Sequence, residues 1–456
     1  MAITTDTIVA PATPIGDGGV GIIRLSGEDA QNLLEKVFHP ASAEHPLDTH
    51  RLYYGKILNS FGEHLDEVLA VLMRGPRSYT REDVVEFHCH GGRVVMGRVL
   101  DHLLDLGARL AYPGEFTLRA FLNGRIDLAQ AEAVIDLIHS RSQAAGNVAL
   151  GQLEGRLSGE IYRFREVLAE LLALVEAHID FPEEEIDGED HERLRLDVGE
   201  VLAGIERLLA SFETGRLLRE GLSVLILGQP NVGKSSLLNA LLGEARAIVT
   251  EEAGTTRDIL EENLVLGGIP LRLVDTAGIR VAENAVEKEG VRRARAKAAA
   301  ADLVLLVVDG ARPLSDGDLL ALEACEDKNI LLVINKCDLD TLPLPSPFAE
   351  LQQIRISAQK GIGLDDLKDA LVNLFSAGGE LESRESVLLS DRRHREALLR
   401  SRTALKGFCG ALEEDRSFEF LAFELREALD ALGEITGETA PDEILNRIFS
   451  RFCIGK

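Results

Sequence analysis

The chain has 456 residues, which is too long for one hydrophobic core and suggests about three domains. Its formal net charge of −27 at pH 7 means that any contact with nucleic acid must use local basic patches against the field of the whole protein. Apolar runs stay well short of the roughly 18 to 20 residues of a membrane span, and the first residues lack the basic and apolar regions of a signal peptide. The 5 cysteines are scattered and show no C-x-x-C spacing, which is typical of a reducing compartment. We therefore expect a cytoplasmic protein without a membrane segment.

The first 118 residues or so mix strand and helix patterns. A turn rich in Pro and Gly, from Pro14 to Gly19, separates the first two apolar runs. Strands are expected at 7–10, 20–25, 51–58, 68–73 and 84–88, and helices at 28–38 and 94–106. This order predicts an α+β domain without a phosphate-binding loop of its own.

The sequence His88-Cys89-His90 raises the question of a metal site. On a strand His88 and His90 share one face while Cys89 points to the other, and no fourth ligand stands at zinc spacing. Ordinary packing or hydrogen bonding is therefore the favoured interpretation.

From about residue 116 to 216, apolar residues recur at helical spacing, as at Leu128, Ala131 and Ile135. This pattern predicts long helices packed as a bundle, broken by an acidic connection at 180–188 that lacks calcium-loop spacing. Helical spacing resumes after about residue 380. A compact domain inserted into a helical domain is favoured, and two separate helical domains are the alternative.

Between the helical stretches, Gly228-Gln229-Pro230-Asn231-Val232-Gly233-Lys234-Ser235 fits the pattern G-x-x-x-x-G-K-[ST] of a phosphate-binding loop, the P-loop. An apolar run at 222–227 predicts a buried strand before it, and 236–242 predicts a helix after it. A helix N-terminus offers unpaired N–H groups that favour phosphate. We expect Lys234 to reach the β- and γ-phosphates and Ser235 to hold Mg²⁺.

Further elements follow in the order that a GTPase needs. A strand at 271–274 leads into Asp275-Thr276-Ala277-Gly278, where the Asp suits the Mg²⁺ shell and the Gly N–H suits the γ-phosphate. After buried strands at 303–309 and 330–334 comes Asn335-Lys336-Cys337-Asp338, whose last carboxylate can accept two hydrogen bonds from guanine. Ser357-Ala358 completes the base pocket. The segment resembles the translation-factor class of P-loop GTPases.

Ile279 stands where Ras-like proteins carry the Gln that orients the attacking water. Arg257 and Arg280 are candidate arginine fingers, and ordinary surface arginines are an equally good interpretation of both. Asn231 suits a monovalent cation, which would place positive charge beside the phosphates.

Several motifs resemble the MnmE (TrmE) family of tRNA-modification GTPases. They are Asp6 to Pro14 with Gly19 to Arg24, Tyr112 to Thr117 with Arg119 to Asn123, Asp127 to Ala133, Gly254 to Asp258, and Arg447 to Lys456. Because these motifs are spread along the sequence, the resemblance covers essentially the full chain.

The resemblance implies a cytoplasmic homodimer whose GTPase domains pair and whose GTP hydrolysis is activated by potassium. It implies a GTPase domain inserted into a helical domain, preceded by a domain that binds 5-formyl-tetrahydrofolate or a related one-carbon folate. It also implies a partner, MnmG, which carries FAD and joins in a heterotetramer or larger complex to place a carboxymethylaminomethyl group on the wobble uridine of certain tRNAs. The expected domain bounds are 1–118 for the folate-binding and dimerisation domain, 119–216 and 379–456 for the helical domain, and 217–378 for the GTPase domain.

The resemblance also implies roles for single residues. Potassium would be held by Asn231 with Thr250, Glu252 and Thr255, and Mg²⁺ by Ser235 and Thr256. Glu287 matches a water-orienting glutamate, and Lys234 and Cys453 are the other catalytic candidates. The folate contacts would be Arg24, Glu86, Arg125 (where some members carry Lys) and Lys456. GTP or GDP would contact Asn231, Val232, Gly233, Lys234, Ser235, Ser236, Thr250, Glu251, Glu252, Ala253, Gly254, Thr255, Thr256, Asp275, Thr276, Ala277, Gly278, Asn335, Lys336, Asp338, Ser357 and Ala358.

Some alternatives stay open on physical grounds. Glu287 lies in a helix-forming stretch and also fits a solvated helix face. Glu86 fits simple pairing with a neighbouring arginine as well as folate binding. Cys453 fits a thiol nucleophile or a small residue in a docking segment, whereas Gly455 and Lys456 exclude a prenylation box. The competing function is a ribosome-assembly or regulatory GTPase switch, which the single P-loop and the missing basic RNA-binding motif disfavour.

Overall fold

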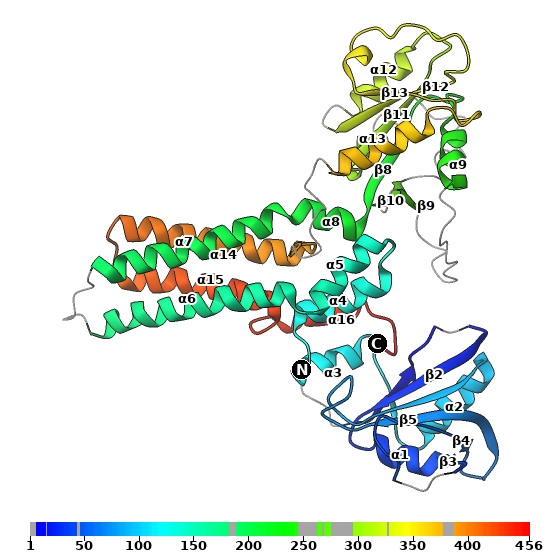
Figure 1. Cartoon of the computed structure of the whole chain (residues 1–456), viewed down its shortest axis with the longest axis vertical. Helices are drawn as coiled ribbons and strands as arrows, with labels where there is room; N and C mark the ends of the chain where they lie inside the picture. Colours follow the sequence, from blue (N-terminus) through cyan, green and yellow to red (C-terminus); the bar gives the residue numbers. More distant parts are fainter. Residues whose placement is uncertain are drawn as a thin grey trace. The chain divides into compact units, whose positions relative to one another are not determined.

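The structure is a computed structural model that describes residues 6–14, 16–42, 46–181, 188–244, 262–266, 269–274, 295–325, 328–376 and 387–456 (Figure 1). Its contacts divide the chain into two compact units. Unit 1 comprises Met1–Ile135, Gln152–Gly199 and Arg400–Lys456, and unit 2 comprises Asp136–Gly151 and Glu200–Leu399.

Unit 1 begins with a sheet of seven strands in the order β3-β4-β5-β6-β2-β1-β7. The strands are β1 Ile8–Pro11, β2 Gly18–Ser26, β3 Phe38–Pro40, β4 Leu52–Leu58, β5 His64–Met73, β6 Val84–Gly91 and β7 Arg109–Leu110. Side chains alternate between the two faces of a strand. Val9, Leu25 and Phe87 therefore share one face, where they form a core with α1 (Ala30–Val37) and α2 (Arg93–Asp105).

The other face of this sheet is covered over only part of its width. Over β1, Ile8 and Ala10 pack against Phe116 of α3 (Glu115–Leu122). Over β4 and β5, Leu52, Tyr54 and Leu69 are 51%, 52% and 41% exposed. We call these three residues the open sheet face. They lie on the same side as Phe116, because the strand registers place Leu52, Val71, Glu86, Arg24 and Ala10 in one row across the sheet.

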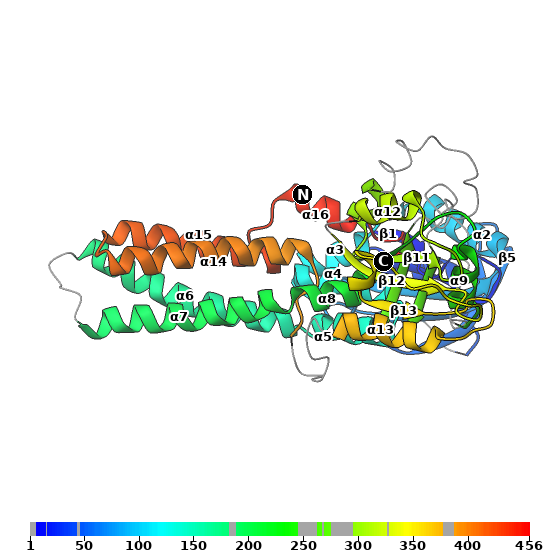
Figure 2. The ribbon, with the colours of Figure 1, turned by 90° about the horizontal axis from the view of Figure 1, so that it is seen from above.

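The helices that follow are α4 Leu128–His139, α5 Gln143–Leu153, α6 Arg156–Asp180, α7 Gly188–Ala210, α8 Phe212–Glu220, α14 Arg392–Glu413, α15 Phe418–Thr436 and α16 Asp442–Phe449. In unit 1, α6 and α15 run side by side with the parts of α7 and α14 that belong to this unit (Figures 1 and 2). An ion pair between Arg426 and Glu176 joins α15 to α6 at 2.5 Å. In the part of the chain that is described, no helix has both the length and the apolar character needed to cross a membrane.

After α16 the chain passes back to the start of unit 1. A Cβ added at Gly114 would collide with the carbonyl oxygen of Phe449, and one at Gly455 would collide with that of Pro11. Both glycines also have positive φ, 71° and 94°. Residues 450–456, the C-terminal tail, are therefore packed closely on β1 and the start of α3.

Unit 2 contains a sheet in the order β13-β12-β11-β8-β10-β9, parallel except for β9. The strands are β8 Leu222–Leu227, β9 Glu262–Leu266, β10 Ile269–Val274, β11 Leu303–Asp309, β12 Asn329–Asn335 and β13 Gln353–Arg355. The helices are α9 Lys234–Glu244, α12 Asp316–Glu323 and α13 Leu364–Ser376, with a 3₁₀ turn at Phe348–Glu350. The carboxyl ends of parallel strands are where α/β sheets bind ligands.

Most elements expected from the sequence are present in the structure. The strand expected at 222–227 is β8, and the helix expected at 94–106 is α2. The sequence did not predict β3, β7 or β9, which are all edge strands. The four expected domain bounds stay a prediction.

Candidate functional site

The P-loop joins the end of β8 to the start of α9. Gly228, Asn231 and Gly233 have positive φ values of 153°, 64° and 101°. A Cβ at Gly228 would collide with the carbonyl oxygen of Val307 in β11, so the loop lies against the neighbouring strand. This tight turn brings the loop backbone to the N-terminus of α9, as phosphate binding requires.

The side chain of Lys234 lies along the loop that it follows. Its Nζ donates to the carbonyl oxygens of Gly228 and Gln229 at 2.9 and 2.8 Å. Burial lowers the pKa of this ammonium. Val232 is fully buried, whereas Asn231, Ser235 and Ser236 are exposed and open to a ligand from solvent.

Asn335 connects the P-loop to the expected base pocket. Its Nδ2 donates to the carbonyl oxygen of Val232 at 2.8 Å, and its Oδ1 accepts from the N–H of Ala358 at 3.0 Å. Ser357, next to Ala358, is almost fully buried. One amide thus holds the phosphate loop and the 357–358 segment at a fixed separation.

A buried carboxylate holds Lys336, and the sequence analysis did not identify it. Lys336 Nζ donates to Asp309 Oδ2 at 2.6 Å. Burial works against the ionised form of Asp309, but hydrogen bonds from Lys336 and the Ala311 N–H hold the pKa of Asp309 below its ordinary value. The sequence signal that could have identified Asp309 is its position at the end of a buried strand.

Asp338 is the residue that the sequence predicts to read a guanine edge. The Ser357 hydroxyl and the Lys360 ammonium hold the pKa of Asp338 below its ordinary value, and Lys360 Nζ lies 3.1 Å from Asp338 Oδ2. The carboxylate is therefore ionised at neutral pH, as an acceptor of two guanine donors must be.

The remaining residues predicted for nucleotide, ion and catalysis fall outside the residues that the structure describes. They are Thr250, Glu251, Glu252, Ala253, Gly254, Thr255, Thr256, Asp275, Thr276, Ala277, Gly278 and Glu287, together with Arg257, Ile279 and Arg280.

In unit 1, three of the four expected folate contacts come together. Arg24 lies opposite Glu86 in the register of β2 and β6, and its Nε donates to Glu86 Oε1 at 2.7 Å. The guanidinium groups of Arg24 and Arg125 lie 5.5 and 4.8 Å from the ring centre of Tyr79. Arg125 also donates to the Tyr79 carbonyl oxygen at 2.9 Å. Sequence reasoning missed Tyr79, because only the fold brings it close to two arginines that are distant in the sequence.

The fourth expected contact, Lys456, belongs to the C-terminal tail. Its N–H donates to the carbonyl oxygen of Cys453 at 3.3 Å, and its neighbour Gly455 packs on Pro11. Pro11 pairs with Ile23, the residue before Arg24. The Cys453 side chain is exposed.

His90 and Cys89 of the His-Cys-His run are engaged in hydrogen bonding and packing, as expected, whereas the buried His88 Nε2 has no hydrogen-bond partner among the described residues. His90 Nδ1 lies 2.6 Å from Asp66 Oδ1, and the His90 N–H donates to Asp66 Oδ2 at 2.8 Å. Cys89 is buried, and its burial, with the nearby charge of Asp66, raises the pKa of its thiol to about 12.

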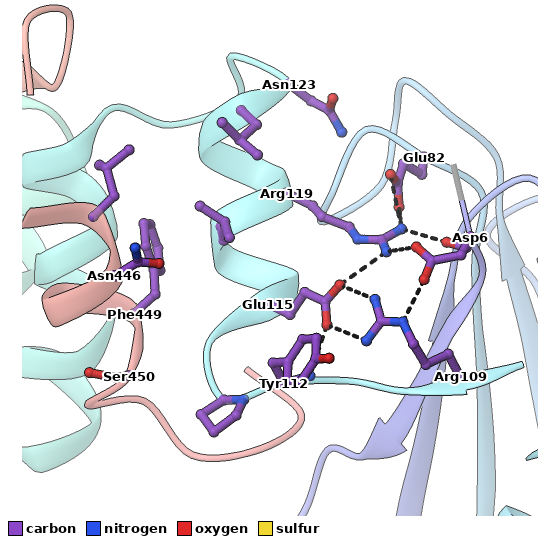
Figure 3. A pocket seen from close by; sticks show the side chains of 14 residues that line it. Asp6, Glu82, Arg109, Tyr112, Glu115, Arg119, Asn123, Asn446, Phe449 and Ser450 are labelled. Atoms are coloured by element: carbon purple, nitrogen blue, oxygen red, sulfur yellow. Dashed lines mark hydrogen bonds and ion pairs between the residues drawn. The ribbon is translucent and has the colours of Figure 1, made fainter. Parts of the chain in front are cut away.

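A network of five charged side chains lies on one side of α3 and was not predicted (Figure 3). Arg119 bonds Asp6, Glu82 and Glu115, at 2.7 Å to Asp6 Oδ1, and Arg109 bonds Asp6 and Glu115. Burial opposes ionisation of Glu115, but Arg109, the Tyr112 N–H and Arg119 hold the pKa of Glu115 below its ordinary value. The network lines a cavity of about 530 Å³. Asp6, Glu115 and Arg119 lie in the family motifs, but the pairing of the five side chains is not visible in the sequence.

Comparisons with known proteins cover the whole chain. Residues 7–125 match the family model described as "GTP-binding protein TrmE N-terminus", and residues 128–453 match the "MnmE helical domain". The tRNA modification GTPase MnmE of Syntrophotalea carbinolica is 59% identical over 100% of both chains, and that of Geobacter metallireducens is 51% identical over 99% of both. A solved G domain of the T. maritima FeoB iron transporter is 25% identical over 33% of this chain and 97% of that chain, with a TM-score of 0.24. The relatives covering the full chain show that it belongs to the MnmE family of tRNA modification GTPases.

Proposed function

We propose that the chain is a potassium-activated GTP hydrolase in tRNA modification. With the FAD-containing partner MnmG, it adds a carboxymethylaminomethyl group to the wobble uridine of certain tRNAs. The observation that carries the GTPase part is the Asn335 amide, which joins the phosphate loop to the base pocket. The tRNA part rests on relatives named tRNA modification GTPase MnmE.

The residues of the P-loop fit GTP with Mg²⁺. Lys234 supplies a cation at the loop, and Ser235, exposed in the first turn of α9, is suited to hold Mg²⁺ together with Thr256. Mg²⁺ would neutralise charge on the phosphates. Asp338, ionised beside Ser357 and Lys360, selects guanine.

Potassium fits the P-loop at Asn231. This residue has a positive φ of 64° and an exposed side chain, so its amide oxygen is open to a cation beside the phosphates. With Ile279 in place of a Gln, a cation and Glu287 supply the charge and the water orientation that hydrolysis needs.

A one-carbon folate fits the group around Tyr79. A pterin ring is planar and can lie against an aromatic ring, and a folate tail carries carboxylates that arginines bind. Arg24 and Arg125 both lie near the Tyr79 ring, Glu86 offers an acceptor, and the C-terminal tail with Lys456 packs on Pro11.

A homodimer formed through the N-terminal part of unit 1 is supported by the open sheet face. Exposed apolar side chains gathered on one sheet face mark an interaction surface. A second copy of this chain would cover Leu52, Tyr54 and Leu69. Pairing of GTPase domains within that dimer is part of the same proposal.

The test is nucleoside mass spectrometry of tRNA from a strain that lacks the gene and is complemented with variants. The wild type should restore the modified wobble uridine, whereas Lys234→Ala and Arg24→Ala should not. Phe423→Ala, at an exposed position on α15, should restore it as the control. Full modification in the deletion strain would support the regulatory switch instead.

The potassium part is tested separately with purified protein. Turnover should be much higher in potassium chloride than in sodium chloride at equal ionic strength, and Asn231→Ala should remove this difference while still binding nucleotide. Glu287→Ala should lower turnover by roughly 10² with little change in GTP affinity. Equal turnover in the two salts would refute potassium activation. Wild-type turnover in Glu287→Ala would support the alternative interpretation, in which Glu287 is a solvent-exposed residue on a helix face.

A further inference from the structure

The cavity in unit 1 has one charged and one apolar side (Figure 3). The charged network lies on one side of α3, and Leu118, Leu122, Leu445 and Phe449 form the apolar side between α3 and α16. Its volume of about 530 Å³ lies within the range of small-molecule sites, roughly 300–1,000 Å³. The space is large enough for one nucleoside.

Tyr112 forms a fixed aromatic platform at this cavity. This residue is 68% exposed, and the Arg109 guanidinium lies 4.8 Å from the ring centre on one face. Asp6 and Glu115 hold Arg109, and Glu115 Oε2 also accepts from the Tyr112 N–H at 2.8 Å. Because one face is covered and the backbone is tied down, the other face is available to stack a planar ring.

The charges of the cavity favour a neutral ring over an anion. Its lining holds the carboxylates of Asp6, Glu82 and Glu115 against only Arg109 and Arg119, so its net charge is 2 − 3 = −1. A phosphate or the carboxylate tail of a folate is therefore disfavoured inside. A neutral nucleobase is compatible with this lining.

Amide groups at the cavity suit the edge of a pyrimidine. Asn123 Nδ2 donates to the Thr80 carbonyl oxygen at 2.6 Å, which leaves its amide oxygen to accept from a ring N–H such as that of uracil. Asn446 of α16 adds an exposed amide.

Two exposed arginines that neighbour cavity residues in the chain suit RNA phosphates. Exposed Arg81 donates to the Asn123 carbonyl oxygen at 2.9 Å, and exposed Arg447 follows Asn446. Phosphate contacts position a nucleic acid, whereas base contacts give it specificity. The two arginines lie next to cavity residues in the chain, outside the negatively charged lining.

We propose that this cavity receives a pyrimidine base, the wobble uridine, extruded from the anticodon of the tRNA substrate. Enzymes that modify a base take it out of the stack and hold it against aromatic side chains with hydrogen bonds to its edge. The inference rests on the proposed function and adds where the base binds. The folate group and the cavity share the 79–82 segment and α3, since Tyr79 and Phe116 belong to the first and Glu82 and Glu115 to the second. A carbon donor and its acceptor would thus lie on two sides of one short segment.

The test uses the full-length protein and an anticodon stem-loop RNA with 4-thiouridine at the wobble position. After irradiation, mass spectrometry should find crosslinks in the peptides that contain Tyr112 or Asn446. Tyr112→Ala should lose these crosslinks, Tyr112→Phe should keep them because it retains the ring, and Phe423→Ala is the matched exposed control. Crosslinks confined to other peptides would overturn the proposal.

A binding measurement adds a second readout. Tyr112→Ala should weaken the uridine-containing RNA about tenfold, as expected for one lost stacking contact, with no change for the same RNA carrying an abasic wobble position. Equal weakening of both RNAs, or no weakening, would overturn the base pocket. A loss of 5-formyl-tetrahydrofolate affinity in Tyr112→Ala instead would assign the cavity to the folate. All of these outcomes can occur while wild-type protein still restores tRNA modification in cells, so they leave the proposed function standing.

Discussion

The predicted nucleotide site of unit 2 and the predicted folate contacts of unit 1 are built in different ways. In unit 2 the functional groups come from short runs such as 228–235 and 335–338, at the ends of parallel strands. In unit 1, Arg24, Glu86 and Arg125 come from three separated segments and meet through strand register and Tyr79. The first site is positioned mainly by backbone, the second by side-chain pairs. Removing a side chain should therefore change nucleotide specificity in unit 2 and folate affinity or stability in unit 1.

The largest effect is expected at the base pocket. Asp338→Asn inverts the hydrogen-bond polarity at the guanine edge and should shift the preference from GTP towards xanthosine triphosphate by a factor on the order of 10⁴. Competition binding with the two nucleotides measures this ratio. Asp340→Asn, exposed in the same loop, should keep the wild-type ratio. An unchanged preference for GTP in Asp338→Asn would contradict the assignment of the pocket.

In unit 1 the largest loss should be one of stability. Arg119→Ala removes a buried cation from Asp6, Glu82 and Glu115 and should lower the free energy of unfolding of unit 1 by about 3 kcal/mol. Near-ultraviolet circular dichroism during urea unfolding can follow this unit, because the chain has no Trp and all 5 Tyr residues lie in unit 1.

The matched control for Arg119→Ala is Arg163→Ala, which removes an exposed arginine paired with Glu160 on α6. It should change stability by less than about 1 kcal/mol. Similar unfolding midpoints for the two variants would show that the network does not hold unit 1 together.

A smaller effect is expected on folate binding. Arg24→Ala should weaken 5-formyl-tetrahydrofolate at least tenfold, about 1.4 kcal/mol, because it removes a cation beside Tyr79 and leaves Glu86 without this partner. Titration calorimetry on the full chain measures the affinity. The control is Arg77→Ala, at an exposed position two residues before Tyr79 in the sequence. An absence of heat with wild-type protein would remove the folate role and leave the GTPase assignment untouched.

The smallest effect is expected on the stability of unit 1 at low pH. The folded-state pKa of Glu115 lies below its ordinary value of 4.5, so the ionised carboxylate stabilises the fold fully above that pH. This contribution is lost as pH falls from 4.5 towards the lower folded-state value. Glu115→Gln should therefore lose less unit 1 stability on acidification than the wild type, measured by the tyrosine signal. The control Glu160→Gln should lose as much stability on acidification as the wild type. Equal acid sensitivity of all three proteins would show that Glu115 does not contribute to this loss of stability.

The sequence predicted elements well where burial is complete. The strand β8 is apolar except for Ser223 because it is covered on both faces, and its bounds match the expected 222–227. The strands β3, β7 and β9 were missed because edge strands are short and partly solvated, which weakens any pattern.

The two predicted sites also differed in how much of them the sequence could predict. A contiguous motif identified Lys234 and Asp338 with their chemistry. The pairing of Lys336 with Asp309, or of Arg119 with Asp6, joins residues 27 or 113 positions apart and depends on strand order, which no local pattern carries. The roles of Arg24, Glu86 and Arg125 came from family resemblance alone.

The C-terminal tail has a consequence for how the chain is made. Domains generally fold from the N-terminal side during synthesis. Here β1 and the start of α3 are synthesised early, yet the segment that covers them, 450–456, leaves the ribosome only after all of unit 2. A nascent chain therefore carries an unfinished surface beside Arg24 through most of its translation. A premature stop within the last few codons would damage the first domain to emerge.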